Sequence, residues 1–233
     1  MGWLELERAE EQELIDGGNH PPELLAENLA DMRRVNRWLG GVQLSVRALA
    51  RLTRADPPGA ELALLDVATG IGDIPHALAV WASRQGRPAR IVATDISPAV
   101  LRTATGPHAP ALAAADGLAL PFPDRCFDVA LCSFALHHLP PAPAARMLAE
   151  MGRVARRGVI INDLVRWRPY YLASLLLCRL ASRNPLTRHD GPLSARRAYT
   201  RAEMLGLARR AGLEPLGFDS FLGYRVALTL RPA

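Results

Sequence analysis

The segment from Leu64 to Asp73, which reads Leu-Leu-Asp-Val-Ala-Thr-Gly-Ile-Gly-Asp, constrains the fold more than any other part of the chain. An apolar run ends in an acid, passes through a turn with two glycines, and enters a helix that begins near Asp73 and Pro75. Acids and prolines are both favoured in the first turn of a helix. The pattern therefore predicts a βα unit with Asp66 at the carboxyl end of the strand, the edge where open α/β sheets bind ligands.

The turn of this unit does not match the loops that bind nucleotide phosphates. The dinucleotide pattern requires a third glycine where this chain has Pro75, and the Walker pattern requires a lysine, which the chain lacks throughout. Gly70 and Gly72 let the backbone approach a ligand closely, and Asp66 suits a cationic ligand better than a pyrophosphate. The alternative interpretation is an ordinary βα turn with incidental glycines.

The same segment resembles the glycine-rich first motif of the class I S-adenosylmethionine (SAM) methyltransferases, and it looks most like their menaquinone/ubiquinone C-methyltransferase branch. Ala68 stands where many members have the first glycine. The resemblance implies a Rossmann-like α/β fold with a mostly parallel seven-stranded sheet and a C-terminal antiparallel hairpin. It also implies SAM as the cofactor, bound in part by Asp66, Ala68, Gly70 and Gly72. It covers residues 62–163 well and the rest loosely.

Downstream of the motif, short apolar runs alternate with helical patterns. The predicted strands are 62–67, 90–94, 111–115, 127–133 and 158–162, and the predicted helices are 74–84, 98–105, 142–155 and 202–211. Such alternation is typical of a parallel sheet that is covered on both faces. Two further strands, 216–221 and 224–230, are expected to form the closing hairpin.

Two regions lie outside this alternation. Residues 1–56 are expected to form an N-terminal helical segment, with a break at Gly40-Gly41, before a methyltransferase domain at 60–233. Residues 164–199 contain an apolar helix candidate and then a polar stretch at 184–192 that is predicted to be a loop. Long connections are often functional, so residues 164–199 are predicted to form a helical cap inserted over the active site.

Further strand ends supply candidates for the cofactor site. The resemblance implies that Asp95 binds the ribose hydroxyls, since a carboxylate accepts strong hydrogen bonds from two hydroxyls; capping of the next helix is the alternative. Asp116 and Gly117 follow the third strand, where family members contact the adenine. The remaining candidates are Ile96 beside the adenine, Ser133 at the end of the fourth strand, and Asn36 or Arg37 on the carboxylate of SAM. The alternative for the segment with Arg37 is a surface helix that Trp38 anchors.

Candidates for chemistry lie between the fourth strand and the cap. The resemblance implies methyl transfer to an oxygen or carbon, and a base is needed there only to remove the acceptor proton. Histidine titrates near neutral pH, so the candidate bases are His138, Asp163 and His189. The alternative for His137 and His138 is a structural role that orients the loop.

The apolar side chains of the predicted cap indicate the chemical class of the methyl acceptor. Phe134, Arg166 and Tyr170 are predicted to bind the substrate, and their surroundings predict a lipophilic phenol, quinone or polyketide-derived molecule. A salt-bridged hinge is the alternative for Arg166, and a dimer interface is the alternative for the apolar cap residues. Residues 33–41 and the Arg-His-Asp-Gly-Pro-Leu stretch also resemble methyltransferases found with type III polyketide synthases.

Composition and charge limit the kinds of molecule that the protein is expected to bind. The formal net charge is +5, but the arginines are spread along the chain, so nucleic-acid binding is unlikely. The three cysteines have no metal-ligand spacing and no metal site is expected. No signal peptide or membrane span is evident, and a cytoplasmic location is expected. A homodimer stays open, as do a non-catalytic SAM-binding protein and an RNA-directed methyltransferase.

Overall fold

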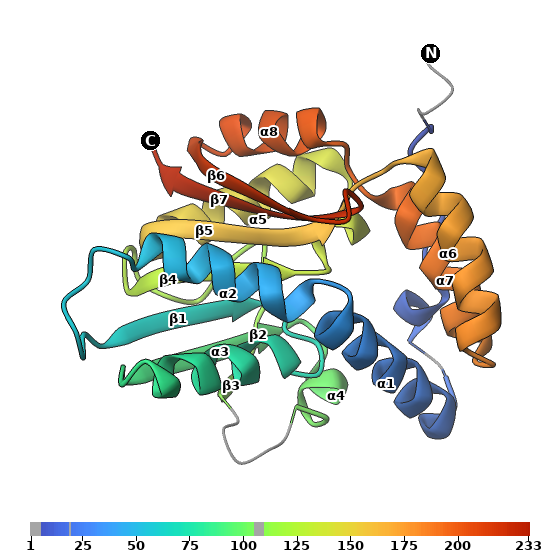
Figure 1. Ribbon diagram of the computed structural model, residues 1–233, viewed down its shortest axis with the longest axis horizontal. Helices are drawn as coiled ribbons and strands as arrows, with labels where there is room; N and C mark the ends of the chain where they lie inside the picture. The colour runs from blue at the N-terminus through green and yellow to red at the C-terminus, as the bar shows by residue number, and fades with distance from the viewer. Residues whose placement is uncertain (1–5, 19, 105–109) are drawn as a thin grey trace.

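A sheet of seven strands forms the centre of the computed structural model, which describes residues 6–18, 20–104 and 110–233 (Figure 1). The strands are β1 (Leu62–Val67), β2 (Ala89–Asp95), β3 (Ala111–Ala114), β4 (Phe127–Ser133), β5 (Ala155–Leu164), β6 (Leu213–Phe221) and β7 (Arg225–Pro232). Their order is β3-β2-β1-β4-β5-β7-β6. Only β7 runs antiparallel to its neighbours. The expected α/β fold, with a mostly parallel sheet and a closing hairpin, is confirmed.

Helices cover both faces of the sheet (Figure 1). One face packs against α2 (Gly41–Leu52) and α3 (Asp73–Arg84), and the other packs against α5 (Pro141–Val154) and α8 (Arg201–Arg210). Because successive strand residues point to opposite faces, Leu64 lies in the first of these two cores and Leu65 in the second. The short α4 (Pro98–Leu101) lies beside β2 and β3.

A third group of helices lies beyond the carboxyl ends of the parallel strands (Figure 1). It consists of α1 (Pro22–Trp38), α6 (Arg168–Ala181), α7 (Pro185–Arg197) and the 3-10 turns η1 (Leu14–Gly17) and η2 (Leu136–His138). The strand order reverses between β1 and β4, and such a switch point opens a crevice at this edge. The predicted cap segment therefore lies at the edge where a ligand would bind.

The loop predicted at residues 184–192 is wrong, because this stretch belongs to α7. Asn184 caps the helix by accepting hydrogen bonds from the backbone N–H groups of Leu186 and Thr187. Gly191 is required where α7 packs on α6, since a Cβ there would clash with Sγ of Cys178. Tertiary packing thus outweighs the weak helix propensity of glycine and proline.

The N-terminal region consists of helices, and the second of them, α2, packs against the sheet. The break at Gly40 occurs as expected, between α1 and α2. The predicted boundary falls in the loop between α2 and β1, but Leu44 and Leu49 of α2 are buried in the sheet core. The helix predicted at 98–105 is shorter, since α4 ends at Leu101, and position 105 lies outside the described residues. None of the helices in the described part of the chain has the length and apolar character needed to cross a bilayer.

Candidate active site

A pocket lies at the switch point, between the end of β1 and the helices at the carboxyl edge. Its walls come from α1, from the loop after β1, from the start of α3 and from the end of β4. The lining residues are Leu29, Met32, Asn36, Asp66, Ala68, Thr69, Gly70, Ile71, Asp73, Ile74, Ser133 and Phe134. The structure thus brings together four of the residues that the sequence predicts for the cofactor, Asp66, Ala68, Gly70 and Ser133, and Phe134 from the predicted substrate site.

The backbone around the pocket adopts conformations that side chains disfavour. Ala68 has φ +56°, Phe134 has φ +60° and Gly70 has φ +56°. A left-handed conformation at a non-glycine residue is uncommon, and such residues cluster at binding sites. A Cβ at Gly70 would meet open space, so this glycine serves the backbone conformation of the turn.

Asp66 is the buried acid of the pocket. Its carboxylate is 3% exposed, and its Oδ1 has no hydrogen-bond partner among the described residues. Burial raises the pKa of Asp66 to about 7, and the negative charges of Asp73 and Asp95 act in the same direction. The hydroxyl of Thr69 acts on the pKa of Asp66 in the opposite direction. A buried carboxylate oxygen without a hydrogen bond is costly, and a cation or hydrogen-bond donor in the pocket would relieve that cost.

Asp95 links two loops at the carboxyl edge. Its Oδ2 accepts a hydrogen bond from the N–H of Gly70 at 3.0 Å, and its Oδ1 accepts one from the N–H of Ser97 at 2.9 Å. The helix cap is Ser97, whose hydroxyl accepts from the N–H of Val100. Since a carboxylate offers about four lone-pair positions, Asp95 keeps capacity for the two hydroxyls of a ribose.

The expected adenine side is more open. The side chain of Ile96 is 72% exposed, which leaves an apolar surface beside Asp95 without a partner. Asp116 accepts a hydrogen bond from the N–H of Leu118 and is exposed, and Gly117 packs closely on Val67. These positions fit the predicted adenine contacts, which stay predictions.

Arg225, at the start of β7, is a site residue that sequence reasoning missed. Its guanidinium is fully buried and donates to Oδ1 of Asn162 at 2.8 Å and to Oδ1 of Asn36 at 2.9 Å. It also donates to the hydroxyl of Ser133 at 3.2 Å and lies over the ring of Phe134. The network reaches the pocket through both Ser133 and Phe134.

One nitrogen of this guanidinium, Nη1, has no hydrogen-bond partner among the described residues. Burial lowers the pKa of Arg225, against the opposing charges of Asp163 and Asp73. Asn36 also donates to Asp73 at 3.0 Å, so α1 and α3 are joined at the pocket. A buried cation with a free N–H at this place suits an anionic ligand group.

Arg37, predicted to bind the carboxylate of SAM, is exposed and lies over the ring of Trp38. The adjacent residue, Asn36, lines the pocket instead. Helix geometry explains the difference, since neighbouring residues on a helix point about 100° apart. The structure therefore favours the alternative of a surface arginine.

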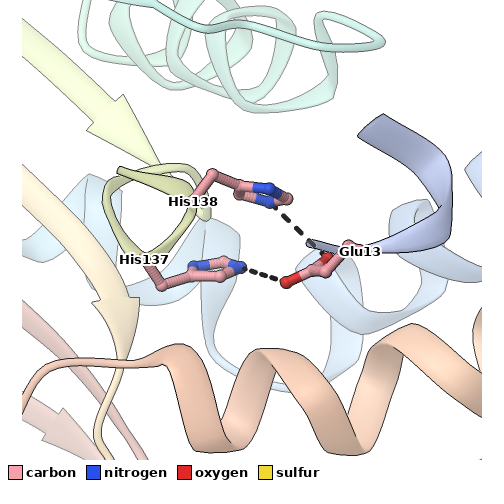
Figure 2. Close-up of side chains that lie close together, drawn as sticks. All are labelled: Glu13, His137 and His138. Carbon is pink, nitrogen blue, oxygen red and sulfur yellow. Dashed lines mark ion pairs between the residues drawn. The ribbon is translucent and has the colours of Figure 1, made fainter. Parts of the chain in front are cut away.

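The candidate bases occupy a second cluster, next to the pocket. Nδ1 of His137 lies 2.7 Å from Oδ1 of Asp163, and both side chains are buried. Burial alone would raise the pKa of Asp163, but the charge and hydrogen bond of His137 hold it below its ordinary value. His138 faces Glu13 (Figure 2). Its Nδ1 lies 3.1 Å from Oδ2 of Asp16. Neither His138 nor Asp163 lines the pocket, so their role as bases stays a prediction.

His189 and Arg166, the predicted base and substrate residue of the cap, both make contacts away from the pocket. His189 lies on α7, where its Nδ1 is 2.8 Å from Asp190, and it does not line the pocket. Arg166 donates to the carbonyls of Leu6 and Ala198 and to Glu203. These contacts favour the hinge alternative for Arg166.

Tyr170 stacks on Tyr224, with ring centroids 4.6 Å apart, and burial raises its pKa. Tyr170 also lies near Arg225, and the positive charge of Arg225 acts on the Tyr170 hydroxyl. By contrast, Leu176 is 61% exposed and Trp167 is 37% exposed. Much of the apolar surface of α6 therefore faces outward rather than toward a substrate.

Comparison with known proteins agrees with this geometry. A family model described as a methyltransferase domain matches residues 65–161. The ubiquinone/menaquinone biosynthesis C-methyltransferase UbiE of Burkholderia mallei is 37% identical over 121 residues, which are 48% of this chain and 46% of that protein. The chain thus spans about half the length of the curated relatives it matches.

Solved structures show the same fold. A SAM-dependent methyltransferase from Aquifex aeolicus has a TM-score of 0.60 at 17% identity, over 92% of this chain and all of that one. The magnesium protoporphyrin IX methyltransferase of Synechocystis PCC 6803, solved with bound S-adenosylhomocysteine (SAH), has a TM-score of 0.56 at 20% identity, over 83% and 84% of the two chains. Residues 65–161 thus match a methyltransferase domain, and the chain as a whole has the fold of these solved SAM-dependent methyltransferases.

Proposed function

We propose that this protein binds SAM in the pocket at the end of β1 and transfers its methyl group to an oxygen or carbon of a small lipophilic acceptor. The single observation that carries the proposal is the pocket itself. It joins the unpartnered Oδ1 of the buried Asp66 to the left-handed turn at Ala68 and Gly70. The matched relative is named as a methyltransferase that acts in quinone biosynthesis, which supports a phenol, quinone or polyketide-derived acceptor.

SAM carries a positive sulfonium, an ammonium and a carboxylate, and the residues around the pocket match these charges. The acids Asp66 and Asp73 line it, and Asp66 would attract the positive groups. Arg225 would face the carboxylate, directly or through Asn36 and Ser133, to which it donates. Asp95, just beyond the turn, would accept the ribose hydroxyls.

The chemistry that the chain must supply is mainly alignment. Methyl transfer is an in-line displacement on a carbon that the sulfonium already activates, and positioning of the two reactants can lower such a barrier by up to about 7–11 kcal/mol. Phe134, held in a left-handed conformation over Arg225, lies where it can fix the acceptor plane. An acceptor hydroxyl also requires a base for its proton, and Asp163, whose partner His137 lies edge-on to Phe134, is a candidate base beside that ring.

The test uses the full chain. SAM binding is measured by calorimetry, and methyl transfer from labelled SAM is then assayed on alkyl-phenols and quinols, on polar acceptors of equal nucleophilicity, and on RNA. We expect SAM binding and faster transfer to the lipophilic set. Binding without transfer to any acceptor would favour a non-catalytic SAM-binding protein. Equal or faster transfer to the polar set would discard the lipophilic acceptor, and transfer to RNA would discard the small-molecule class.

We also propose that the protein forms a homodimer through α6. Four leucines of this helix are exposed at positions i, i+4, i+5 and i+8, and these are Leu172, Leu176, Leu177 and Leu180, at 51%, 61%, 55% and 75%. Such a contiguous apolar surface is typical of an interface.

A further inference from the structure

The side chains of Glu13, His137 and His138 converge on one point beneath the N-terminal segment (Figure 2). Nε2 of His137 lies 3.6 Å from Oε1 of Glu13, and Nε2 of His138 lies 3.7 Å from Oε2. Both separations are too long for a good hydrogen bond. They are close to the spacing of two ligands on one metal ion, since bonds of about 2.0–2.2 Å in tetrahedral geometry place ligand atoms about 3.3–3.6 Å apart.

A second, independent observation concerns His137. Its ring is fully buried, and its Nε2 has no hydrogen-bond partner among the described residues. Nδ1 is held by Asp163 at 2.7 Å. In the neutral ring that binds a metal, a proton on Nδ1 shared with Asp163 leaves the lone pair of Nε2 directed toward Glu13. A buried nitrogen in this state is costly unless something occupies the position in front of it.

The surrounding residues have the arrangement of an outer shell around a metal. His138 is held at Nδ1 by Asp16 at 3.1 Å, so both histidines have a carboxylate behind the ring and Nε2 toward Glu13. Ser194 donates to Oε1 of Glu13 at 2.8 Å and fixes that carboxylate. In metalloproteins, a carboxylate on the far nitrogen of a histidine ligand sets its tautomer and orientation.

The charges near this cluster leave room for a divalent cation. Four carboxylates lie in or beside it, those of Glu13, Asp16, Asp163 and Asp190, and Arg8 and Arg197 are the guanidiniums that lie closest to it in the described contacts. Arg8 and Arg197 donate to backbone carbonyls of His137 and His138. Arg197 approaches Glu13 at 4.0 Å. The N–H groups of Arg8 and Arg197 thus go to backbone carbonyls, and Arg225 is a further guanidinium whose charge acts on Asp163.

We propose that Glu13, His137 and His138 form a site for a divalent transition-metal ion of the zinc class. Two imidazole nitrogens and one carboxylate oxygen suit zinc, cobalt, nickel or iron(II), whereas magnesium and calcium prefer oxygen ligands. The side chain of His138 is 24% exposed, which leaves an opening for water or another ligand at a remaining position. Nothing in the spacing along the chain reveals this site, because more than 120 residues separate Glu13 from the histidines.

The position of the site indicates a structural role for the metal. Glu13 precedes η1, and the histidines form η2 at the end of β4. A metal would therefore fasten the N-terminal segment, residues 6–18, across the carboxyl edge of the sheet. The ring of His137 meets that of Phe134 edge-on, with centroids 5.2 Å apart, so the fastening would hold one wall of the pocket.

The test measures metal binding alone, on untagged full-length protein that has been treated with a chelator. Calorimetric titration with ZnCl₂ is expected to give one site per chain, and CoCl₂ is expected to give the absorption of a four- or five-coordinate ion. MgCl₂ is expected not to compete. Glu13→Gln and His138→Gln should weaken zinc binding at least about 100-fold, and Asp163→Asn should weaken it about 10–100-fold.

Matched controls separate this site from other ligands. His189→Gln removes a histidine that also has a carboxylate at Nδ1 but lies outside the cluster. Cys126→Ser removes a partly exposed thiol. Both variants are expected to bind zinc as the native chain does, with circular dichroism confirming the fold of each variant. Absence of a stoichiometric zinc site in the native chain would overturn the proposal. So would native affinity in both Glu13→Gln and His138→Gln.

Discussion

At the scale of single residues, Asp95 makes the sharpest prediction about the cofactor. Asp95→Ala removes the carboxylate that would accept the ribose hydroxyls, and it also frees the N–H of Gly70. A hydrogen bond to a charged group contributes about 1.5–3 kcal/mol, so the loss of even one of the two should lower SAM affinity roughly 10- to 150-fold. Calorimetry measures this loss. The control is Asp124→Ala, which removes an exposed acid paired with Arg153. Unchanged affinity in Asp95→Ala would remove the ribose assignment.

Asp66 makes a prediction about pH. Its folded pKa is about 7, well above the ordinary value, so between about pH 4 and 7 the folded chain holds a proton at this residue that the unfolded chain lacks. This contribution to stability is present at low pH and is lost as pH rises toward 7. Asp66→Asn should abolish it. The variant should therefore be more stable than the native chain at pH 8, with a smaller difference at pH 5.

The measurement is urea unfolding of both proteins at the two pH values. Asp73 and Asp95, whose charges act on Asp66, are present in both, so their own titration largely cancels in the difference. Each unit of pKa shift corresponds to about 1.4 kcal/mol. A difference in stability that does not change with pH would show that Asp66 ionises with an ordinary pKa.

Sequence patterns predict these residues unevenly, for a physical reason. Asp66 and Asp95 are recognisable because a carboxylate at the end of an apolar strand is a local signal. Arg225 carries no such signal, since its burial depends on the pairing of β7 with β5 and on contact with Asn36, 189 residues away. Glu13 lies in an acidic N-terminal stretch that looks solvated, and only its packing against Ser194 and the histidines buries it.

At the scale of elements, local patterns fix most strands but not the cap. The predicted bounds of β1 and β4 match the structure residue for residue, because both are short apolar runs between clear turn signals. The stretch 184–192 contains Gly191 and Pro192, which indicate a loop, yet it forms the N-cap and the first eight residues of α7. The packing of α7 on α6, and the hydrogen bonds that Asp190 accepts from the N–H groups of Leu14 and Ile15, outweigh that local preference.

The contact between α6 and α7 is testable as a pair. Gly191→Ala places a methyl group against Sγ of Cys178 and should destabilise the protein by about 1–3 kcal/mol. In a Cys178→Ala background the sulfur is gone, and the same substitution should be neutral or stabilising, since alanine is the better helix former. Urea unfolding of the four proteins gives the coupling energy. Equal effects of Gly191→Ala in both backgrounds would show that the two helices are not in this close contact.

At the scale of the whole molecule, the carboxyl edge is assembled from distant parts of the chain. Arg8 and Arg197 donate to the backbone of η2, and Arg166 ties the N-terminal segment to the start of α8 through Leu6 and Glu203. The contacts of Arg197 hold α7 at the carboxyl edge, and α6 packs on α7. The exposed leucines of α6 are left on the outside, with Ser174 as the buried residue of that helix.

This outward surface leads to a prediction about assembly. Glutamate at Leu176 and Leu180 together should disrupt a dimer formed through α6, because two charges would be buried in an apolar interface without partners. Sedimentation at several concentrations is expected to show a dimer for the native chain and a monomer for Leu176→Glu/Leu180→Glu. The substituted positions lie outside the pocket lining, so SAM affinity should stay at the native value. Leu112→Glu, on the edge strand β3 and 41% exposed, is the matched control and should remain a dimer. If the native chain sediments as a monomer at all concentrations, α6 does not form a dimer interface.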